Sequence, residues 1–288
     1  MNITKISDSI PSTENLPIYY DLYYPENSDQ DPLPVILFLH GFKGFKDWGA
    51  FPDACRELSK AGFGVLAINF SLNGVGESMT EFDQLDLFAR ETLTQDLEDV
   101  GMVIKAIKAK EIPGQAVSLA ADTIGVLGHS RGGHTAIAAS AEYPEIKCLV
   151  TWSAVADYNA RWSDDMINDW EEKGFTEIKN GRTGQMMPVK EVVYKDAIEN
   201  ADRLMAVKRV GELDIPAFFI HSKGDEGVSY SEAEKLYKHC NAEDKNIELI
   251  PDSGHTFDTA HPFEEEEFPN AFVRVLSITN NWFQSHLK

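Results

Sequence analysis

The sequence predicts an α/β fold in which a mostly parallel central sheet is covered by helices on both faces. Short apolar runs alternate along the chain with segments of helical periodicity, which is typical of parallel strands joined by crossover helices. The 288 residues are 43% hydrophobic and include 16 Phe and 5 Trp, enough for one large core. We therefore expect a single domain over residues 1–288 with a small inserted cap at approximately 157–211.

The strands are placed by their apolar patterns. Residues 17–24 alternate imperfectly and predict an early antiparallel strand, whereas the later runs are continuously apolar, as in strands buried on both faces. These later strands are expected at 35–39, 64–70, 122–127, 146–152, 215–221 and 246–250.

Helices are expected between the strands. Residues 51–61 read as a helix that ends at Gly62. A longer helix is indicated by apolar residues at helical spacing, namely Leu93, Leu97, Val100, Ile104 and Ile107. Further helices are expected at 134–142, at 229–240 and from Phe263 onward, where the Glu264–Glu267 run would favour a helix start.

Residues 157–211 interrupt this alternation. The segment is polar, carries two tryptophans and contains the turn-like sequence KNGRTG at 179–184. Because a structureless loop of this length is uncommon inside a compact domain, we expect short helices and a hairpin. An insertion at this place would roof a pocket at the carboxyl ends of the strands.

Charge and cysteine content restrict the class of protein. The net charge of −21 and a pI near 4.7 argue against nucleic acid and anionic membranes as partners. The three cysteines form no disulfide framework or metal-ligand spacing, so neither a metal nor another cofactor is expected. The start of the chain lacks the pattern of a signal peptide, and no apolar run reaches membrane-spanning length. We expect a cytoplasmic monomer or homodimer.

A candidate nucleophile lies in the sequence GHSRG at residues 128–132. A predicted strand precedes it and an alanine-rich segment follows it, so Ser130 would occupy a sharp strand-to-helix turn. Such a turn strains the central residue and exposes its hydroxyl near the backbone N–H groups of the helix start. The competing interpretation is that Ser130 only caps the helix.

A nucleophilic serine needs a base, and on this kind of fold the order along the chain is Ser, then Asp or Glu, then His. The histidines after Ser130 are His134, His221, His239, His255, His261 and His286. We favour His255, because it lies in a loop directly after the last predicted strand, with His261 as the alternative.

For the acid, we favour Asp225, which follows a predicted strand in the sequence HSKGDEGV. Its carboxylate would orient His255 and stabilise the imidazolium. Glu226 and Asp252 are alternatives, and a solvated turn aspartate is the structural interpretation. The two N–H donors of an oxyanion hole are assigned to Arg131, after the nucleophile, and to Phe42, in the loop after an early buried strand.

The sequences HGFKG, GHSRGG, GDEGV and SGHTF, in this order, resemble the α/β-hydrolase superfamily. Within it, the chain is similar to dienelactone-hydrolase-like and cinnamoyl-esterase-like serine hydrolases from about residue 17 onward. The resemblance implies an α/β-hydrolase fold, a triad of Ser130, His255 and Asp225, and oxyanion donors at Phe42 and Arg131. The chain departs from many members by reading NFSLNGVGES at 69–78, where they carry D-x-R-G-x-G-x-S.

We therefore expect a hydrolase that cleaves carboxylic esters of small molecules through an acyl-Ser130 intermediate. The alternatives are a serine peptidase or amidase, a thioesterase, and a ligand-binding protein that does not catalyse. The sequence specifies no site for a peptide amino terminus.

The cap and the loop after the first buried strand bring aromatic residues that are candidates to line the substrate pocket, namely Phe45, Trp48, Trp162 and Trp170. They predict a mostly apolar acyl pocket that accepts short or aromatic acyl groups. The net charge of −21 predicts slow capture of polyanionic esters.

Overall fold

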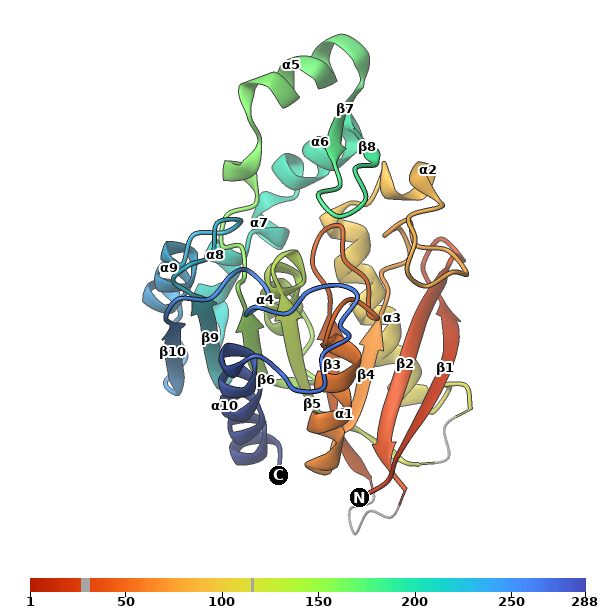
Figure 1. The fold of residues 1–288 in the computed structure, drawn as a ribbon, viewed down its shortest axis with the longest axis vertical. Helices are drawn as coiled ribbons and strands as arrows, with labels where there is room; N and C mark the ends of the chain where they lie inside the picture. Colours follow the sequence, from red (N-terminus) through yellow and green to blue (C-terminus); the bar gives the residue numbers. More distant parts are fainter. Residues whose placement is uncertain (27–31, 115–116) are drawn as a thin grey trace.

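The computed structural model describes residues 1–26, 32–114 and 117–288, and its core is an eight-stranded sheet (Figure 1). The strand order is β1-β2-β4-β3-β5-β6-β9-β10. The strands are β1 (Ile3–Pro11), β2 (Pro17–Pro25), β3 (Leu33–Leu39), β4 (Gly64–Ile68), β5 (Leu119–His129), β6 (Ile146–Trp152), β9 (Ala217–Ser222) and β10 (Lys245–Ile250). β2 is antiparallel to both of its neighbours, and every other pairing in the sheet is parallel. The predicted mostly parallel sheet is confirmed.

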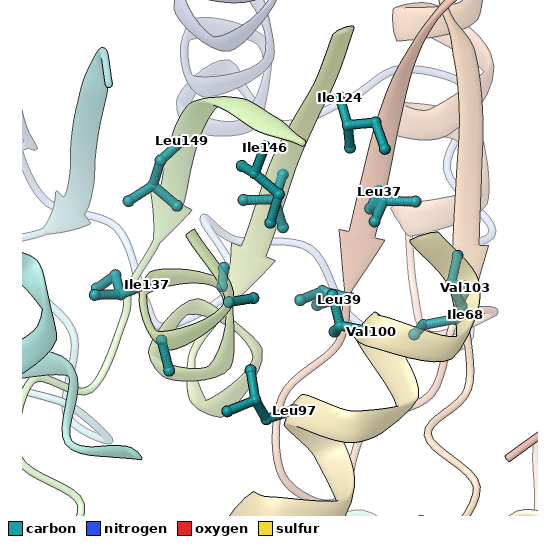
Figure 2. Packing of buried hydrophobic residues seen from close by; sticks show 14 of the residues in the cluster. Leu37, Leu39, Ile68, Leu97, Val100, Val103, Ile124, Ile137, Ile146 and Leu149 are labelled. Atoms are coloured by element: carbon teal, nitrogen blue, oxygen red, sulfur yellow. The ribbon is translucent and has the colours of Figure 1, made fainter. Parts of the chain in front are cut away.

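Helices cover both faces of this sheet. They are α1 (Phe51–Lys60), α3 (Leu93–Ala109), α4 (Arg131–Glu142), α9 (Ser231–His239) and α10 (Asn270–Leu287). The short helix α2 (Leu85–Phe88) belongs instead to a separate apolar cluster through Phe88. α3 and α4 belong to the core on one face, and α1 and α10 to the core on the other. Figure 2 shows residues of the first of these cores, among them Leu37 and Leu39 of β3 and Val100 of α3.

Two elements differ from the sequence prediction. β1 was not expected, because its residues are mostly polar and only partly buried at the sheet edge, although it pairs with β2 along its whole length. The last helix was predicted to start too early. It begins at Asn270, after Pro269, and the Glu264–Glu267 run lies in the preceding loop.

The segment between β6 and β9 forms short elements above the carboxyl ends of the strands (Figure 1). They are η1 (Asn159–Arg161), α5 (Asp164–Lys173), β7 (Phe175–Lys179), β8 (Met186–Lys190), α6 (Glu191–Glu199), α7 (Ala201–Leu204), α8 (Ala206–Arg209) and η2 (Val210–Glu212). β7 and β8 pair as the antiparallel hairpin expected around KNGRTG.

The two ends of this segment pack differently. Trp170, Met187 and Val189 form a separate apolar cluster together with Phe45 and residues of the 75–88 region. Residues 204–206, in contrast, are part of the main core on the α4 face of the sheet. A single domain with a cap over residues 157–211 stays our prediction for how the chain is organised, with the end of that segment attached to the main core.

Candidate functional site

Ser130 lies at a strained corner between β5 and α4. Its φ of 56° and ψ of −118° place it in a region that side-chain-bearing residues rarely adopt. Glycine is required around it. A Cβ at Gly128 would overlap the Gly132 carbonyl group, and one at Gly133 would lie 2.6 Å from Ala154 Cβ. The backbone N–H of Ser130 donates to the Trp152 carbonyl oxygen at 2.8 Å, which ties the corner to β6.

The loop after β3 lies against this corner. A Cβ at Gly41 would be 2.9 Å from Ser130 Cβ, so the two backbones approach closely. His40 holds the loop, because its Nδ1 donates to the Gly41 carbonyl oxygen at 2.9 Å while its Nε2 accepts from Phe70 N–H at 3.3 Å. Burial lowers the pKa of His40 to about 4, so the ring stays neutral in this role.

The loop and the helix start each offer a backbone donor. In the described parts of the chain, neither Phe42 N–H nor Arg131 N–H donates a hydrogen bond to a protein acceptor. Phe42 and Arg131 both line the same cavity as Ser130. Two unused N–H groups beside a serine are the arrangement that stabilises a negatively charged oxygen.

His255 and Asp225 form a hydrogen-bonded pair. His255 Nδ1 donates to Asp225 Oδ2 at 2.7 Å, and the Asp225 carboxylate is fully buried while the imidazole is 30% exposed. The other carboxylate oxygen accepts from the N–H groups of Gly227 and Val228, each at 2.8 Å. With Nδ1 carrying the proton, His255 Nε2 is left with a lone pair, as a base requires.

A second histidine supports the acid. His221, at the end of β9, is completely buried, and its Nε2 lies 3.3 Å from Asp225 Oδ2 and 2.9 Å from the Val228 carbonyl oxygen. Burial alone would raise the pKa of Asp225, but the hydrogen bonds from His221 and His255 outweigh it and hold the pKa well below its usual range. These contacts therefore favour the ionised form of Asp225.

The structure places the alternative residues elsewhere. His261 Nδ1 accepts the Gly49 N–H at 2.9 Å, and its ring packs against Trp48 and Phe45. Glu226 and Asp252 are exposed, and in the described structure neither carboxylate forms a hydrogen bond or an ion pair with His255.

His129 contributes to the site although the sequence did not single it out. Its Nε2 donates to the His255 carbonyl oxygen at 3.1 Å, and the two ring centroids are 4.7 Å apart. Burial, with the nearby His255 as a second cause, lowers the pKa of His129 to about 3, so it acts as a neutral donor. Its position beside Ser130 in GHSRG was the available signal.

Ser130 and His255 both line two cavities, which also share Phe42 and Lys43. The larger has a volume of about 320 Å³ and the smaller of about 240 Å³. No hydrogen bond joins Ser130 Oγ to His255 Nε2 among the described residues. In ligand-free enzymes such bonds are often long and shorten only when substrate binds.

The predicted pocket aromatics divide into two groups. Trp162 lines the larger cavity and Trp48 the smaller one, while Phe42 lines both. Phe45 and Trp170 line neither, which corrects the prediction for these two. Both are buried in the apolar cluster that includes Met187 and Val189, where Trp170 Nε1 donates to the Val189 carbonyl oxygen.

Arg131 also lines the larger cavity, but its guanidinium is buried in a charge cluster. It is 2.8 Å from Asp96 and 3.3 Å from Glu91, and it lies over the rings of Phe42 and Tyr158. The side chain therefore holds the helix start in place, and the backbone N–H of Arg131 has no protein acceptor in the described structure.

Two further observations concern ions and membranes. Across residues 1–26, 32–114 and 117–288, no group of His, Cys, Asp and Glu side chains is arranged to hold a metal ion. In the same parts of the chain, no helix is both long and apolar enough to cross a membrane.

Comparison with known proteins places this geometry in a family. The model of the prolyl oligopeptidase family matches residues 56–276. An Escherichia coli relative, described as an uncharacterized 31.7 kDa protein in the traX–finO intergenic region, is 27% identical over 282 residues, which covers 88% of this chain and 91% of that protein.

Solved structures share the fold. The esterase domain of a Rhodothermus marinus protein superposes with a TM-score of 0.67 at 19% identity, and the two chains cover each other completely. A dienelactone hydrolase from Anabaena variabilis superposes with a TM-score of 0.62 at 16% identity, again over 100% of both chains. The resemblance to the α/β-hydrolase superfamily is confirmed.

Proposed function

Because the chain belongs to the prolyl oligopeptidase family of hydrolases, we propose that it is a serine esterase that cleaves small carboxylic esters with Ser130 as nucleophile. This proposal rests on one observation: the strained Ser130 lines the same cavity as His255, which is hydrogen-bonded to Asp225. A strained serine, an oriented imidazole and two free N–H donors are the parts that acyl transfer needs.

In the proposed reaction, Ser130 Oγ attacks the ester carbonyl carbon while His255 Nε2 accepts the hydroxyl proton. The oxyanion that forms accepts hydrogen bonds from Phe42 N–H and Arg131 N–H. His255 then returns the proton to the alcohol that leaves. Water attacks the acyl-Ser130 carbonyl in the second half, again losing its proton to His255, and the acid is released.

Asp225 acts through His255 in this scheme. Its buried carboxylate fixes the tautomer and stabilises the imidazolium that forms in each half-reaction. His221 and the N–H groups of Gly227 and Val228 keep that carboxylate in place, and His129 holds the backbone of the His255 loop. All of these interactions position the catalytic groups.

A peptidase is the second candidate, because the family is named for one. The cavity linings favour an ester. Within the described residues, neither cavity presents an Asp or Glu side chain that would bind the ammonium group of a peptide. The larger cavity is lined by apolar side chains that suit a short or aromatic acyl group, including Phe42, Tyr158, Trp162 and Met166.

The proposal includes a small-molecule ester as the partner, without nucleic acid or membrane, and a cytoplasmic monomer or homodimer. All three cysteines are free and buried, which is consistent with a reducing compartment.

The test is the Ser130→Ala variant, assayed with acetyl, butyryl, feruloyl and palmitoyl esters and with a matched anilide. We expect turnover of the short and feruloyl esters to fall by at least ~10³-fold, with loss of fluorophosphonate labelling. Ser140→Ala, on the same helix but with its hydroxyl bonded to the Ala136 carbonyl oxygen, is the control and should retain activity. Near-normal hydrolysis by Ser130→Ala would overturn the proposal, and a preference for the anilide would favour the peptidase.

A further inference from the structure

The charged side chains that line the two cavities are all cationic. Lys43 lines both cavities, Arg161 and Arg131 line the larger one, and Arg182 lines the smaller one. No carboxylate side chain accompanies them within the described residues. The chain as a whole has 47 acidic and 26 basic residues, so this local excess of positive charge is the reverse of the overall composition.

Lys43 and Arg161 differ from the other cations in having no acidic partner. In the described structure, neither forms a salt bridge, and each side chain donates only one hydrogen bond to a protein oxygen. Lys43 Nζ donates to the Lys179 carbonyl oxygen at 3.3 Å, and Arg161 Nη2 donates to the Gly227 carbonyl oxygen at 3.1 Å. Since a lysine has three donors and an arginine five, most of their donors remain free.

The two side chains are also close enough to repel each other. Burial lowers the pKa of Lys43, and the positive charge of Arg161 lowers it further. Two like charges that line one cavity repel each other, which is unfavourable. An anion placed between them would remove that cost.

The backbone of Lys43 is strained as well. Gly44 N–H donates to the Gly41 carbonyl oxygen at 3.0 Å, which closes a turn whose third residue is Lys43 with a φ of 56°. Glycine or asparagine is the usual residue at such a position. Lys110, at the end of α3, also has a positive φ, so the strain at Lys43 does not identify a function by itself, but it is consistent with a use for the side chain.

We propose that Lys43 and Arg161 form a subsite that binds a carboxylate carried by the ester substrate, next to Ser130. This inference rests on the proposed function and names its substrate class. It revises the expectation from the net charge, because capture depends on the local charge of the cavity rather than on the total. The carboxylate belongs either to the acyl part or to the alcohol part of the ester.

Two pairs of substrates distinguish these parts. Mono(4-nitrophenyl) adipate carries the carboxylate on the acyl side, and 4-nitrophenyl hexanoate is its neutral partner. 4-Acetoxybenzoate carries it on the alcohol side, and methyl 4-acetoxybenzoate is the neutral partner. The measured quantity is the anionic-to-neutral ratio of kcat/KM, compared between the native protein and variants so that intrinsic ester reactivity cancels.

The variants remove one charge each. Lys43→Asn keeps a residue that tolerates a positive φ, and Arg161→Gln keeps a polar side chain. Each should lower the anionic-to-neutral ratio about 10-fold or more for one of the two pairs, mainly through KM. Lys43→Arg, which keeps the charge, should preserve most of the ratio. Lys238→Gln on the exposed side of α9 removes the same charge elsewhere and should leave the ratio unchanged.

Binding is measured separately from turnover. Calorimetry of Ser130→Ala with mono(4-nitrophenyl) adipate and with 4-acetoxybenzoate should detect one of them, with affinity that falls as salt is raised and that is lost in Lys43→Asn. If esters are hydrolysed through Ser130 but neither Lys43→Asn nor Arg161→Gln changes the anionic-to-neutral ratio of kcat/KM, the subsite proposal is wrong and the proposed function stands. If no ester is hydrolysed through Ser130, the proposed function fails instead, and the calorimetry still decides whether the anion binds at Lys43 and Arg161.

Discussion

Arg131 and the pair Lys43 and Arg161 line the same cavity, yet their charges have opposite surroundings. The Arg131 guanidinium is 2% exposed and lies within salt-bridge distance of both Glu91 and Asp96. Lys43 and Arg161 have only carbonyl oxygens as protein partners in the described structure. A buried charge with its partners in place belongs to the fold, whereas charges that lack partners at a cavity are available to a ligand.

The same contrast separates the two sides of the site. On the side of the strand ends, each group that we assign to catalysis is held by several neighbours. Asp225 accepts two N–H bonds and lies beside two histidines, and the Ser130 backbone is tied to β6. On the side of the cap, Lys43 and Arg161 are each held by a single hydrogen bond. We therefore expect substitutions on the first side to change kcat or stability, and those on the second to change specificity.

The largest effect is expected on the first side, from His255→Ala. Loss of the base should lower kcat by at least ~10³-fold, and adding Asp225→Asn should cost little more, because members of a triad act as a unit. His261→Ala is the matched control, since its ring is bonded to Gly49 and lines neither cavity, and it should keep most of the activity. Steady-state kinetics with a short-chain ester measures all three. Equal losses in the two histidine variants would contradict the assignment.

Arg131→Met should have the next largest effect, on stability. The substitution leaves Glu91 and Asp96 buried without their cation, and removing one partner from a buried charge cluster costs about 3–5 kcal/mol. Arg161→Gln removes the same charge from the exposed side of the cavity, where it should change the free energy of unfolding by no more than about 0.5 kcal/mol. Urea denaturation of both variants gives the comparison.

The loss in Arg131→Met should also depend on pH. Burial already raises the pKa of Asp96 above its usual value, and removing the positive charge of Arg131 raises it further. The folded variant then binds more protons than the unfolded chain, so its stability falls as the pH rises. We expect the difference from the native protein to be larger at pH 8 than at pH 5. A loss that is the same at both pH values, or smaller at pH 8, would argue that Glu91 and Asp96 are not the cause.

The residues at the strand ends were the part of the site that could be predicted from the sequence. Ser130, Asp225 and His255 each follow an apolar run, and the ends of parallel strands meet at one edge of the sheet, so chain order and strand position were sufficient to bring them into one hypothesis. The glycines of GHSRGG predicted the sharp turn at Ser130, because a Cβ at these positions would overlap neighbouring atoms.

The cap side was not predictable in the same way. Trp162 and Trp170 lie eight positions apart on similar polar stretches, yet one lines the cavity and the other is buried among Phe45 and Val189. Which side chains of such short segments face inward depends on tertiary contacts that no local pattern records. The burial of the Arg131 guanidinium and the free donors of Lys43 likewise depend on residues distant in sequence, namely Glu91, Asp96 and the β7 backbone.

Apart from the Arg161→Gln control, the smallest expected change in stability comes from Lys43→Gly, which tests whether Lys43 is kept for a ligand. A φ of 56° costs a side-chain-bearing residue about 1–3 kcal/mol, and glycine removes this strain from the folded state. Glycine also gives the unfolded chain more conformational freedom, which lowers stability by roughly 0.5–1 kcal/mol. The variant should therefore be more stable by about 1 kcal/mol, a rise in Tm of about 2 °C for a domain of this size. It should also lose the preference for carboxylate-bearing esters, since the charge is gone. A more stable protein with a weaker preference would mean that the native lysine lowers stability in exchange for recognition. A Lys43→Gly protein less stable than the native one would show that the lysine side chain supports the fold, as Arg131 does.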